Sequence, residues 1–428
     1  MTRALAEAFE RFSRNGGGEG PAEVLTRRRE AFSRFAATGF PSSRDEEWRF
    51  TPVSAIERTD WTPAAEPVRR PAPSELDPYR IGPPEWTTLV FVNGRYDAGL
   101  SHRSGLPFGV AITPLAQALT RHPALLDLAD ATPFSALNAA FARDGAIIRV
   151  AAGVDLADPI HLLFVTTADA AGQTVQVRSM IAVEQGARAQ FVESYAGLGG
   201  AASFTNAVTD VTVGAAAWVE HSRIQRESES AYHIGLTRVE QARDSHYRSF
   251  TLAMGGAISR HDLRARLGDE NVETLLYGLY LGRGDQLVDN HTVIYHDRPN
   301  GRSWEVYKGV LDGKSHAVFN GKVFVTPEAQ KTDAKQTNRN LLLSDGAKVN
   351  TKPQLEIFAD DVRCTHGATV GRLDETAFFY LQSRGIPRDA AKRLLTYAFA
   401  AEVTAEVASA PVREALDRLV LERLGGLA

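Results

Sequence analysis

The sequence is poor in cysteine, since Cys364 is the only thiol among its 428 residues. A single cysteine excludes a disulfide framework within the chain, and it excludes a zinc or iron–sulfur site made from the cysteines of this chain alone. Long apolar runs are also missing, because no stretch approaches the roughly 18 apolar residues of a membrane span. Charged residues such as Arg3, Glu7 and Arg11 interrupt the start of the chain, which argues against a secretory signal. We therefore expect a cytoplasmic protein with no membrane partner.

An excess of positive charge is absent as well. The chain has 48 Lys and Arg against 52 Asp and Glu, which gives a formal net charge of −4. Such a balance argues against a nucleic-acid partner, because nothing would neutralise a run of phosphates. Apolar residues make up 43% of the chain, as in an ordinary globular protein, and the length suggests two or three structural units.

The first unit, residues 1–145, is predicted to be largely helical. Apolar residues recur at helical spacing in the first 60 residues. Seven prolines between residues 62 and 86 predict an irregular connector, and Leu89–Val92 predicts a short strand before a turn.

The second unit, residues 146–371, has the pattern of a β-structure. Short β-branched runs alternate with turns, and Glu184–Arg188 has a relative in Glu240–Arg243, 56 residues later, which is twice 28. Strands separated by small-residue corners suit either a sandwich or a parallel β-helix. About 225 residues is long for one sandwich, and polar residues at every second position leave one face of each strand buried. We favour the β-helix.

The third unit, residues 372–428, is predicted to contain three helices, over 375–384, 389–403 and 411–424. The apolar stripes of the last two are wide for the end of a chain, so we expect them to cover another surface. The residues of these stripes that we single out are Leu394, Leu395, Ala398, Leu416, Leu419 and Val420.

Two segments have features of a functional site, but a structural interpretation is favoured for both. Gly313-Lys314-Ser315 resembles the end of a phosphate-binding P-loop, but Gly309 to Gly313 encloses three residues where that loop needs four. We therefore expect a tight turn and no bound nucleotide. The polar stretch from Lys331 to Asn350 is interpreted as a solvated face, with a contact surface for another subunit as the alternative.

Cys364 and His366 form the most specific motif. On a strand their spacing puts both side chains on one face, and both are ligands that iron, copper and zinc accept. Burial statistics alone favour two structural residues. Two ligands cannot complete a four-coordinate site, so any metal there would be shared with another chain.

The segment that contains this motif resembles a known family. The match rests on Asp360–Gly371, Leu381–Pro387, Gln336–Ser344 and Glu46–Arg49. These segments are similar to those of the SufB/SufD family of iron–sulfur cluster assembly proteins, over nearly the whole chain. The single cysteine, the length and the helical N-terminus resemble the SufD branch, since SufB tends to be longer and to carry several cysteines.

The resemblance implies a mainly β fold, a right-handed parallel β-helix flanked by helical regions. It implies a non-catalytic scaffold subunit of the SufBCD complex, with a role in iron acquisition. SufB would pair with the β-helix, and the ATPase SufC would dock on the C-terminal helices. His366 would face a SufB cysteine at a transient iron–sulfur cluster, with Cys364 as a less secure participant. From the chemistry of imidazole alone, we expect Asp360 or Asp361 to accept a hydrogen bond from its second nitrogen.

Alternatives remain at this point. A β-helix carbohydrate-active enzyme and a purely structural scaffold without cluster contact are both compatible with the pattern of strands. The isolated chain could also form a homodimer.

Overall fold

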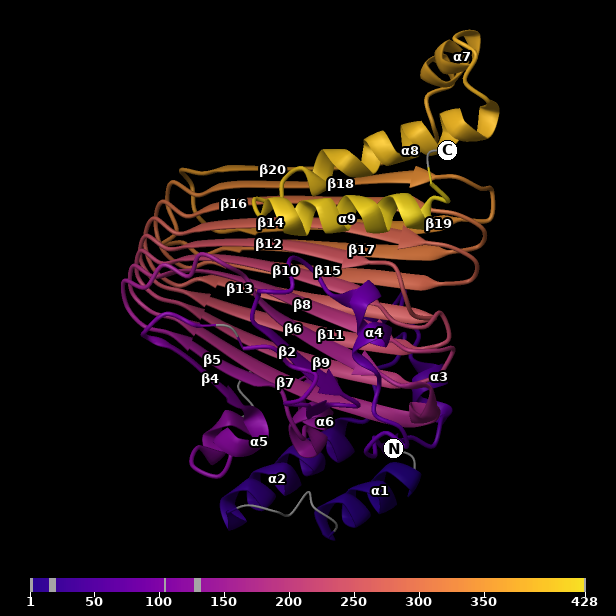
Figure 1. Cartoon of the computed structure of the whole chain (residues 1–428). Coiled ribbons are helices and arrows are strands. Elements are labelled where there is room, and N and C mark those ends of the chain that lie inside the picture. Colours follow the sequence, from indigo (N-terminus) through magenta and orange to yellow (C-terminus); the bar gives the residue numbers. More distant parts are fainter. Residues whose placement is uncertain (1–2, 15–20, 104, 127–131, 427–428) are drawn as a thin grey trace.

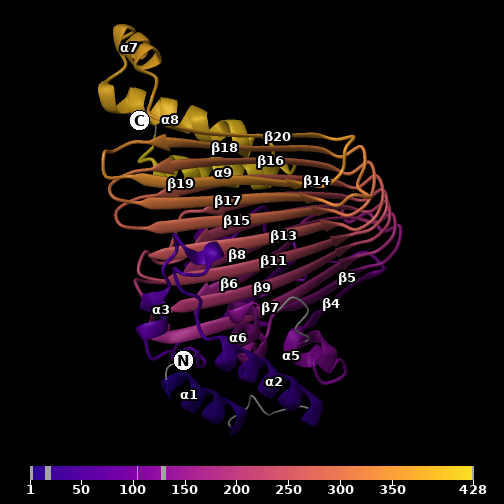
Figure 2. The same ribbon diagram turned by 180° about the vertical axis from the view of Figure 1, so that it is seen from behind.

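The computed structural model describes residues 3–14, 21–103, 105–126 and 132–426. Its centre is a β-solenoid of about eight turns, in which each turn gives one strand to each of two facing sheets (Figure 1). Helices lie at both ends of the solenoid (Figure 2). The predicted parallel β-helix with flanking helices is confirmed.

The odd-strand sheet forms one wall of the solenoid. Its strands, in spatial order, are β4 (Val110–Pro114), β5 (Ala146–Val150), β7 (Gln173–Val183), β9 (Phe204–Val213), β11 (Tyr232–Gln241), β13 (Ile258–Leu267), β15 (Leu287–His296), β17 (His316–Val325) and β19 (Lys348–Ile357), with β1 (Thr62–Pro63) beside β7. All neighbours from β5 to β19 run parallel, and β4 runs antiparallel to β5.

The even-strand sheet forms the opposite wall. Its strands are β3 (Arg95–Tyr96), β2 (Thr88–Val92), β6 (Ile160–Thr166), β8 (Arg188–Gly197), β10 (Trp218–Arg226), β12 (His246–Ala253), β14 (Glu273–Gly282), β16 (Arg302–Leu311), β18 (Asp333–Leu342) and β20 (Arg363–Gly371). Because β2 and β4 lie before residue 146, the two sheets extend into the segment that the sequence assigns to the N-terminal unit.

The register shows that the weak repeat of the sequence spans two turns of the solenoid, although the repeated letters are offset by two residues, because Val183 and not Gln185 is the register equivalent of Gln241. Val183 is paired with Val213, and Val213 with Gln241, on successive turns of the solenoid. The two related corners after Val183 and Gln241 therefore lie two turns apart. Gly186 adopts a positive φ of 66° at the first corner and Asp244 a φ of 58° after the second, which a tight corner between strands requires.

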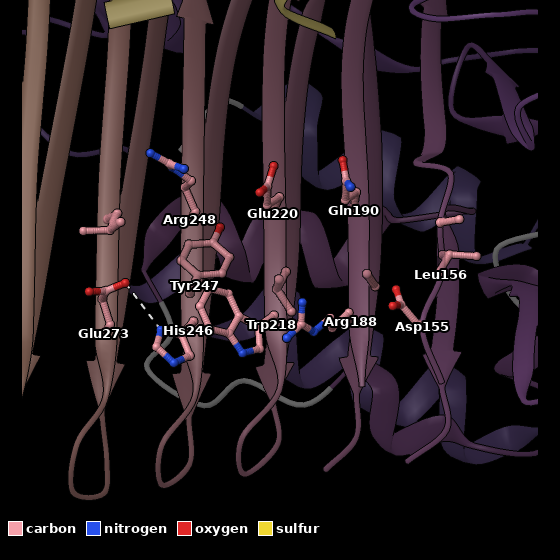
Figure 3. A pocket seen from close by; sticks show the side chains of 14 residues that line it. Asp155, Leu156, Arg188, Gln190, Trp218, Glu220, His246, Tyr247, Arg248 and Glu273 are labelled. Atoms are coloured by element: carbon pink, nitrogen blue, oxygen red, sulfur yellow. Dashed lines mark hydrogen bonds and ion pairs between the residues drawn. The ribbon is translucent and has the colours of Figure 1, made fainter. Parts of the chain in front are cut away.

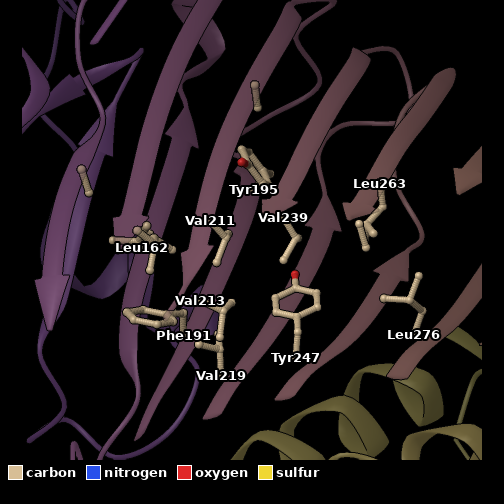
Figure 4. Close-up of a cluster of buried hydrophobic side chains, with 14 of the residues drawn as sticks. Leu162, Phe191, Tyr195, Val211, Val213, Val219, Val239, Tyr247, Leu263 and Leu276 are labelled. Carbon is tan, nitrogen blue, oxygen red and sulfur yellow. The ribbon is translucent and has the colours of Figure 1, made fainter. Parts of the chain in front are cut away.

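The lumen between the sheets holds the main hydrophobic core. Alternate residues of the strands point inward, and side chains such as Leu162, Phe191, Val211, Val239 and Leu276 line the lumen along the solenoid (Figure 4). At about 25 cal/mol per Å² of apolar surface, this burial supplies the main driving force for the fold.

The N-terminal helical region covers the first turns. Its helices are α1 (Arg3–Arg14), α2 (Ala22–Thr38), η1 (Glu46–Trp48), α3 (Ser54–Arg58), α4 (Pro73–Leu76), η2 (Asp77–Tyr79), α5 (Leu115–Ala118), η3 (Pro123–Leu126) and α6 (Pro133–Phe141), followed by η4 (Ala168–Ala170) between strands. An aromatic cluster joins α1, α2 and α6 to the outer face of the odd-strand sheet at Phe204 and Ile234.

The C-terminal helices are α7 (Glu375–Ser383), α8 (Arg388–Thr404) and α9 (Ala410–Arg423). Helices α8 and α9 lie against the outer face of the even-strand sheet, whereas α7 projects away from the solenoid (Figure 1). Asp374 caps α7, because its carboxylate accepts the backbone N–H groups of Thr376 and Ala377. None of the helices in the described ranges combines the length and the apolar character that crossing a bilayer requires.

Candidate functional site

The Cys-x-His motif lies on β20, the terminal strand of the even-strand sheet, where β18 is its neighbour. Cys364 is paired in register with Ala334, and His366 with Gln336. Ala334 and Gln336 are buried and point into the lumen. Since register partners on parallel strands turn the same way, Cys364 and His366 both point toward the lumen at the end of the solenoid. The two side chains share one face, as their spacing predicts.

The two side chains of the motif differ in exposure. His366 is exposed, whereas Cys364 is partly buried and packs against the cluster of Val323, Val325 and Ala334. Burial raises the pKa of the Cys364 thiol, with a smaller contribution from the nearby Asp333 carboxylate. The thiol is thus mainly protonated near neutral pH in this chain, while the imidazole is the accessible group.

The carboxylates that precede β20 belong to the turn before the strand, five and six residues from His366. Asp361 forms an ion pair with Lys331, and both it and Asp360 are exposed on the turn that leads into the strand. Within the described residues, no three His, Cys, Asp or Glu side chains come together in a way that could hold a metal ion.

The polar stretch 331–350 is not the solvated face that the sequence suggests. Gln336, Asn338 and Asn340 are buried and point into the lumen, while Lys335 and Arg339 point outward. Asn338 Nδ2 donates to the Tyr280 hydroxyl at 2.9 Å. The prediction of a solvated face is wrong for alternate residues, because the β-helix needs polar side chains to bond with one another inside its last turns.

Buried ionisable pairs deeper in the lumen escaped the sequence analysis. Glu193 Oε2 lies 3.1 Å from His221 Nε2, and Glu227 Oε2 lies 2.6 Å from His233 Nδ1. His221 lies 28 residues from Glu193 in the sequence, whereas His233 lies only six residues from Glu227. The alternation of inward and outward residues could have indicated the first pair, since His221 and Glu193 occupy inward positions of β10 and β8.

The C-terminal residues divide into two groups. Leu416, Leu419 and Val420 of α9 are buried in a cluster with the outer face of the even-strand sheet, so the surface that they cover belongs to their own chain. On α8, Leu394 and Ala398 are exposed and Leu395 is partly exposed. The sequence could not separate these groups, because both stripes have helical spacing.

Helix α7 carries the largest exposed aromatic side chains of this region. Phe379 is 72% exposed and Tyr380 is 55% exposed. Helix α7, which carries them, projects from the solenoid (Figure 1), and Leu394 of α8 is 37% exposed. Exposed apolar surface of this kind marks contact sites for other proteins.

The N-terminal Glu46–Arg49 segment is bound to the outer face of the odd-strand sheet. The Arg260 guanidinium lies 3.6 Å from the centre of the Trp48 ring, and Arg260 also pairs with Asp289 at 2.9 Å. Glu47 lies 3.2 Å from His291. This segment therefore fastens the N-terminal region to the solenoid, and that role explains its composition.

The segment that resembles a P-loop is a turn. It connects β16 to β17, and Gly313 adopts a positive φ of 67°. A P-loop opens a helix so that its backbone N–H groups surround the phosphates. The turn leads into a strand instead, as the sequence predicts.

A groove of about 300 Å³ crosses the outer face of the even-strand sheet at the starts of β8 to β14 (Figure 3). Trp218 stacks on His246 with ring centres 3.7 Å apart, and His246 Nδ1 lies 3.4 Å from Glu273. Burial raises the pKa of Glu220 there. Arg188 and Arg248 alternate with Glu220 and Glu273, so the groove lining favours neither sign of charge.

Comparison with known proteins gives matches over almost the whole chain. Residues 164–399 match the family model described as SUF system FeS cluster assembly, SufBD core domain, and residues 6–162 match the SufBD protein N-terminal region. An iron–sulfur cluster assembly SufBD family protein of Synechocystis is 34% identical over 412 residues, which cover 93% of this chain and 90% of that protein.

Two further relatives are similar over comparable lengths. The iron–sulfur cluster assembly protein SufD of Escherichia coli is 33% identical over 391 residues, covering 91% of this chain and 89% of that protein. The chloroplastic protein ABCI7 of Arabidopsis thaliana is 32% identical over 88% of this chain and 81% of its own length. On these matches, the chain belongs to the SufBD family of the SUF iron–sulfur cluster assembly system.

Proposed function

We propose that this chain is the SufD-type subunit of a SufBCD scaffold, a non-catalytic component that pairs with SufB, takes part in iron acquisition and docks the ATPase SufC. The observation that carries the proposal is the position of His366, an exposed imidazole that faces the lumen at the end of the solenoid. The transient iron–sulfur cluster is cargo, held partly by this chain and partly by SufB.

The end of the solenoid supports pairing with SufB. Strand β20 has β18 on one side, and among the described residues no strand covers its other side. Val370 of β20 is 48% exposed, and Ile357 and Phe358 at the end of β19 are also exposed. An uncovered strand edge with apolar side chains beside it is a template for pairing with another β-structure. A second copy of this chain would compete for the same edge, so the isolated chain would form a homodimer there.

A shared site suits a cluster that must leave. Cys364 and His366 supply at most two ligands, so the other ligands of a four-coordinate iron come from the partner. Neutral imidazole binds iron through one nitrogen, and a small rotation between the two subunits would separate the ligands and release the cluster.

The exposed surface of α7 and α8 supports docking of the ATPase. Phe379, Tyr380 and Leu394 are exposed and would form the contact. Lys308 fastens α8 to the solenoid through the Phe399 carbonyl oxygen at 3.0 Å and through Glu402. Movement of a docked ATPase would thus be transmitted through α8 to β16. Leu416, Leu419 and Val420 act indirectly, by holding α9 on the sheet.

The family match leaves the carbohydrate-active alternative without support, and the purely structural scaffold is the competing hypothesis. Affinity purification of the tagged chain from its own cells tests the proposal. We expect SufB and SufC to co-purify in a stable complex that carries iron and sulfide. Recovery of the chain alone, or of a complex without SufB, would refute the proposed pairing.

A further inference from the structure

Gln336 occupies the lumen position directly behind His366. On β18 it is paired in register with Glu305 of β16 on one side and with His366 of β20 on the other. Strands in such a ladder lie about 4.8 Å apart, so the three side chains follow one another along a single inward-facing column. Gln336 is therefore the inner neighbour of the imidazole.

The carboxamide of Gln336 is fixed at its nitrogen end. Nε2 donates to Glu305 Oε2 at 2.7 Å. From the opposite sheet, Gly321 leaves the space that the amide fills, because a Cβ atom there would lie 2.1 Å from Nε2. Because Nε2 is bonded to Glu305 and occupies the space beside Gly321, the amide has a defined orientation in the lumen.

The oxygen end of the same amide is unsatisfied. Gln336 is 1% exposed, and in the described part of the chain no group donates a hydrogen bond to its Oε1 atom. A buried carbonyl oxygen without a donor loses about 1–3 kcal/mol, so such atoms normally have a partner. Neutral imidazole carries one N–H donor and one acceptor nitrogen, and a hydrogen bond to the N–H fixes the tautomer.

We propose that Gln336, oriented by Glu305 and Gly321, is the positioning residue of His366 and accepts the imidazole N–H at Oε1. That bond leaves the other ring nitrogen free as the donor to iron. The inference rests on the proposed function of His366, and it replaces Asp360 and Asp361 as the acceptor.

The hydrogen bond is tested first without iron, in the isolated full-length chain. The probe is the ring ¹⁵N spectrum of a histidine-labelled sample at a pH where the imidazole is neutral, with the His366 signals assigned through His366→Ala. Gln336→Leu should change the ratio of the two neutral tautomers of His366 by about fivefold, the value of one ordinary hydrogen bond. Asn340→Leu is the matched control, since it also removes a buried lumen amide of β18 but is paired with Val370.

Conservative changes separate positioning from packing. Glu305→Gln keeps an acceptor for Gln336 Nε2, so the tautomer ratio of His366 should equal that of wild type. Glu305→Leu removes the acceptor and should move the ratio toward that of Gln336→Leu. An unchanged ratio in Gln336→Leu, or an equal change in Asn340→Leu, would overturn the assignment.

The second measurement uses the complex with SufB and SufC, reconstituted with iron and sulfide. Gln336→Leu should bind iron about tenfold more weakly than wild type, as is usual when the partner of a metal-binding histidine is removed. If His366→Ala lowers iron binding and Gln336→Leu does not, the positioning role is refuted while the function of His366 stands. If neither variant changes iron binding, the proposed function itself fails, and the tautomer ratio in the isolated chain still decides the hydrogen bond.

Discussion

Gln336 donates a hydrogen bond of 2.7 Å to Glu305 inside the lumen, and both side chains are almost completely buried. Burial raises the pKa of Glu305 to about 7, although the hydrogen bond from Gln336 acts in the opposite direction. Near neutral pH a substantial fraction of this carboxyl therefore stays protonated in the folded chain.

Glu305→Gln should stabilise the protein at high pH. The unfolded carboxyl releases its proton near pH 4.5 and the folded one near pH 7, so folding stability falls as the pH rises through this window and the loss remains above it. The difference corresponds to about 3 kcal/mol. Urea unfolding should show Glu305→Gln more stable than wild type by about that amount at pH 8, and by less than about 1 kcal/mol at pH 5. The same advantage at both values would contradict a raised pKa.

The α7 surface can be tested separately from the packing of α9. Phe379→Asp replaces an exposed ring with a charged side chain. Because the ring is exposed, the fold should be unchanged, while binding of SufC falls. Leu416 is fully buried, and Leu416→Asp should lower the free energy of unfolding by several kcal/mol. Pull-down with SufC and thermal unfolding of both variants provide the comparison. Undiminished SufC binding by folded Phe379→Asp would count against docking on α7.

The contact between Trp48 and Arg260 fastens the N-terminal region to the solenoid. Trp48→Ala should lower the free energy of unfolding by about 3–5 kcal/mol and expose the N-terminal region to proteolysis. Trp304 is the control. Arg302 lies 3.8 Å from the centre of the Trp304 ring, so the type of contact is the same, but Trp304 is only partly buried. Equal losses for Trp48→Ala and Trp304→Ala would show that the N-terminal contact has no special importance.

The isolated chain should hydrolyse no ATP. Gly313 and Lys314 lie in a turn between two strands, which provides no helix N-terminus for phosphates. A preparation free of SufC should show no phosphate release above background, and Lys314→Ala should not change this result. ATP turnover that disappears in Lys314→Ala would disprove the assignment of the turn.

The fold could be predicted from the sequence because the pattern of each strand and corner is visible in short stretches of the chain. Inward and outward residues alternate on each strand, and the corner after Val183 has a relative after Gln241, so a stack of parallel strands could be predicted. The spacing of Cys364 and His366 likewise fixed their common face. What the sequence could not reveal was contact between successive turns.

The missed features all depend on that contact. From the sequence alone, Gln336 is predicted to be a surface residue. Its neighbour in the lumen, Glu305, lies 31 residues earlier in the chain. Leu416 and Leu394 have the same periodic signal, and only the position of the even-strand sheet buries one and exposes the other. In both cases the environment comes from strands that are remote in sequence.

The proposed function requires that His366 contributes to the site of the nascent cluster. The direct test is the iron and sulfide content of the complex with SufB and SufC, purified with wild type, His366→Ala or Cys364→Ser. The chain should fold and assemble in all three cases, because His366 is exposed and packs against little of its own chain.

We expect His366→Ala to lower the affinity for iron at least about tenfold, and Cys364→Ser to have a smaller effect because the partly buried thiol is mainly protonated. Wild-type iron and sulfide in the His366→Ala complex, together with normal activity of cluster-dependent enzymes in cells, would contradict the proposed role and show that the histidine is structural.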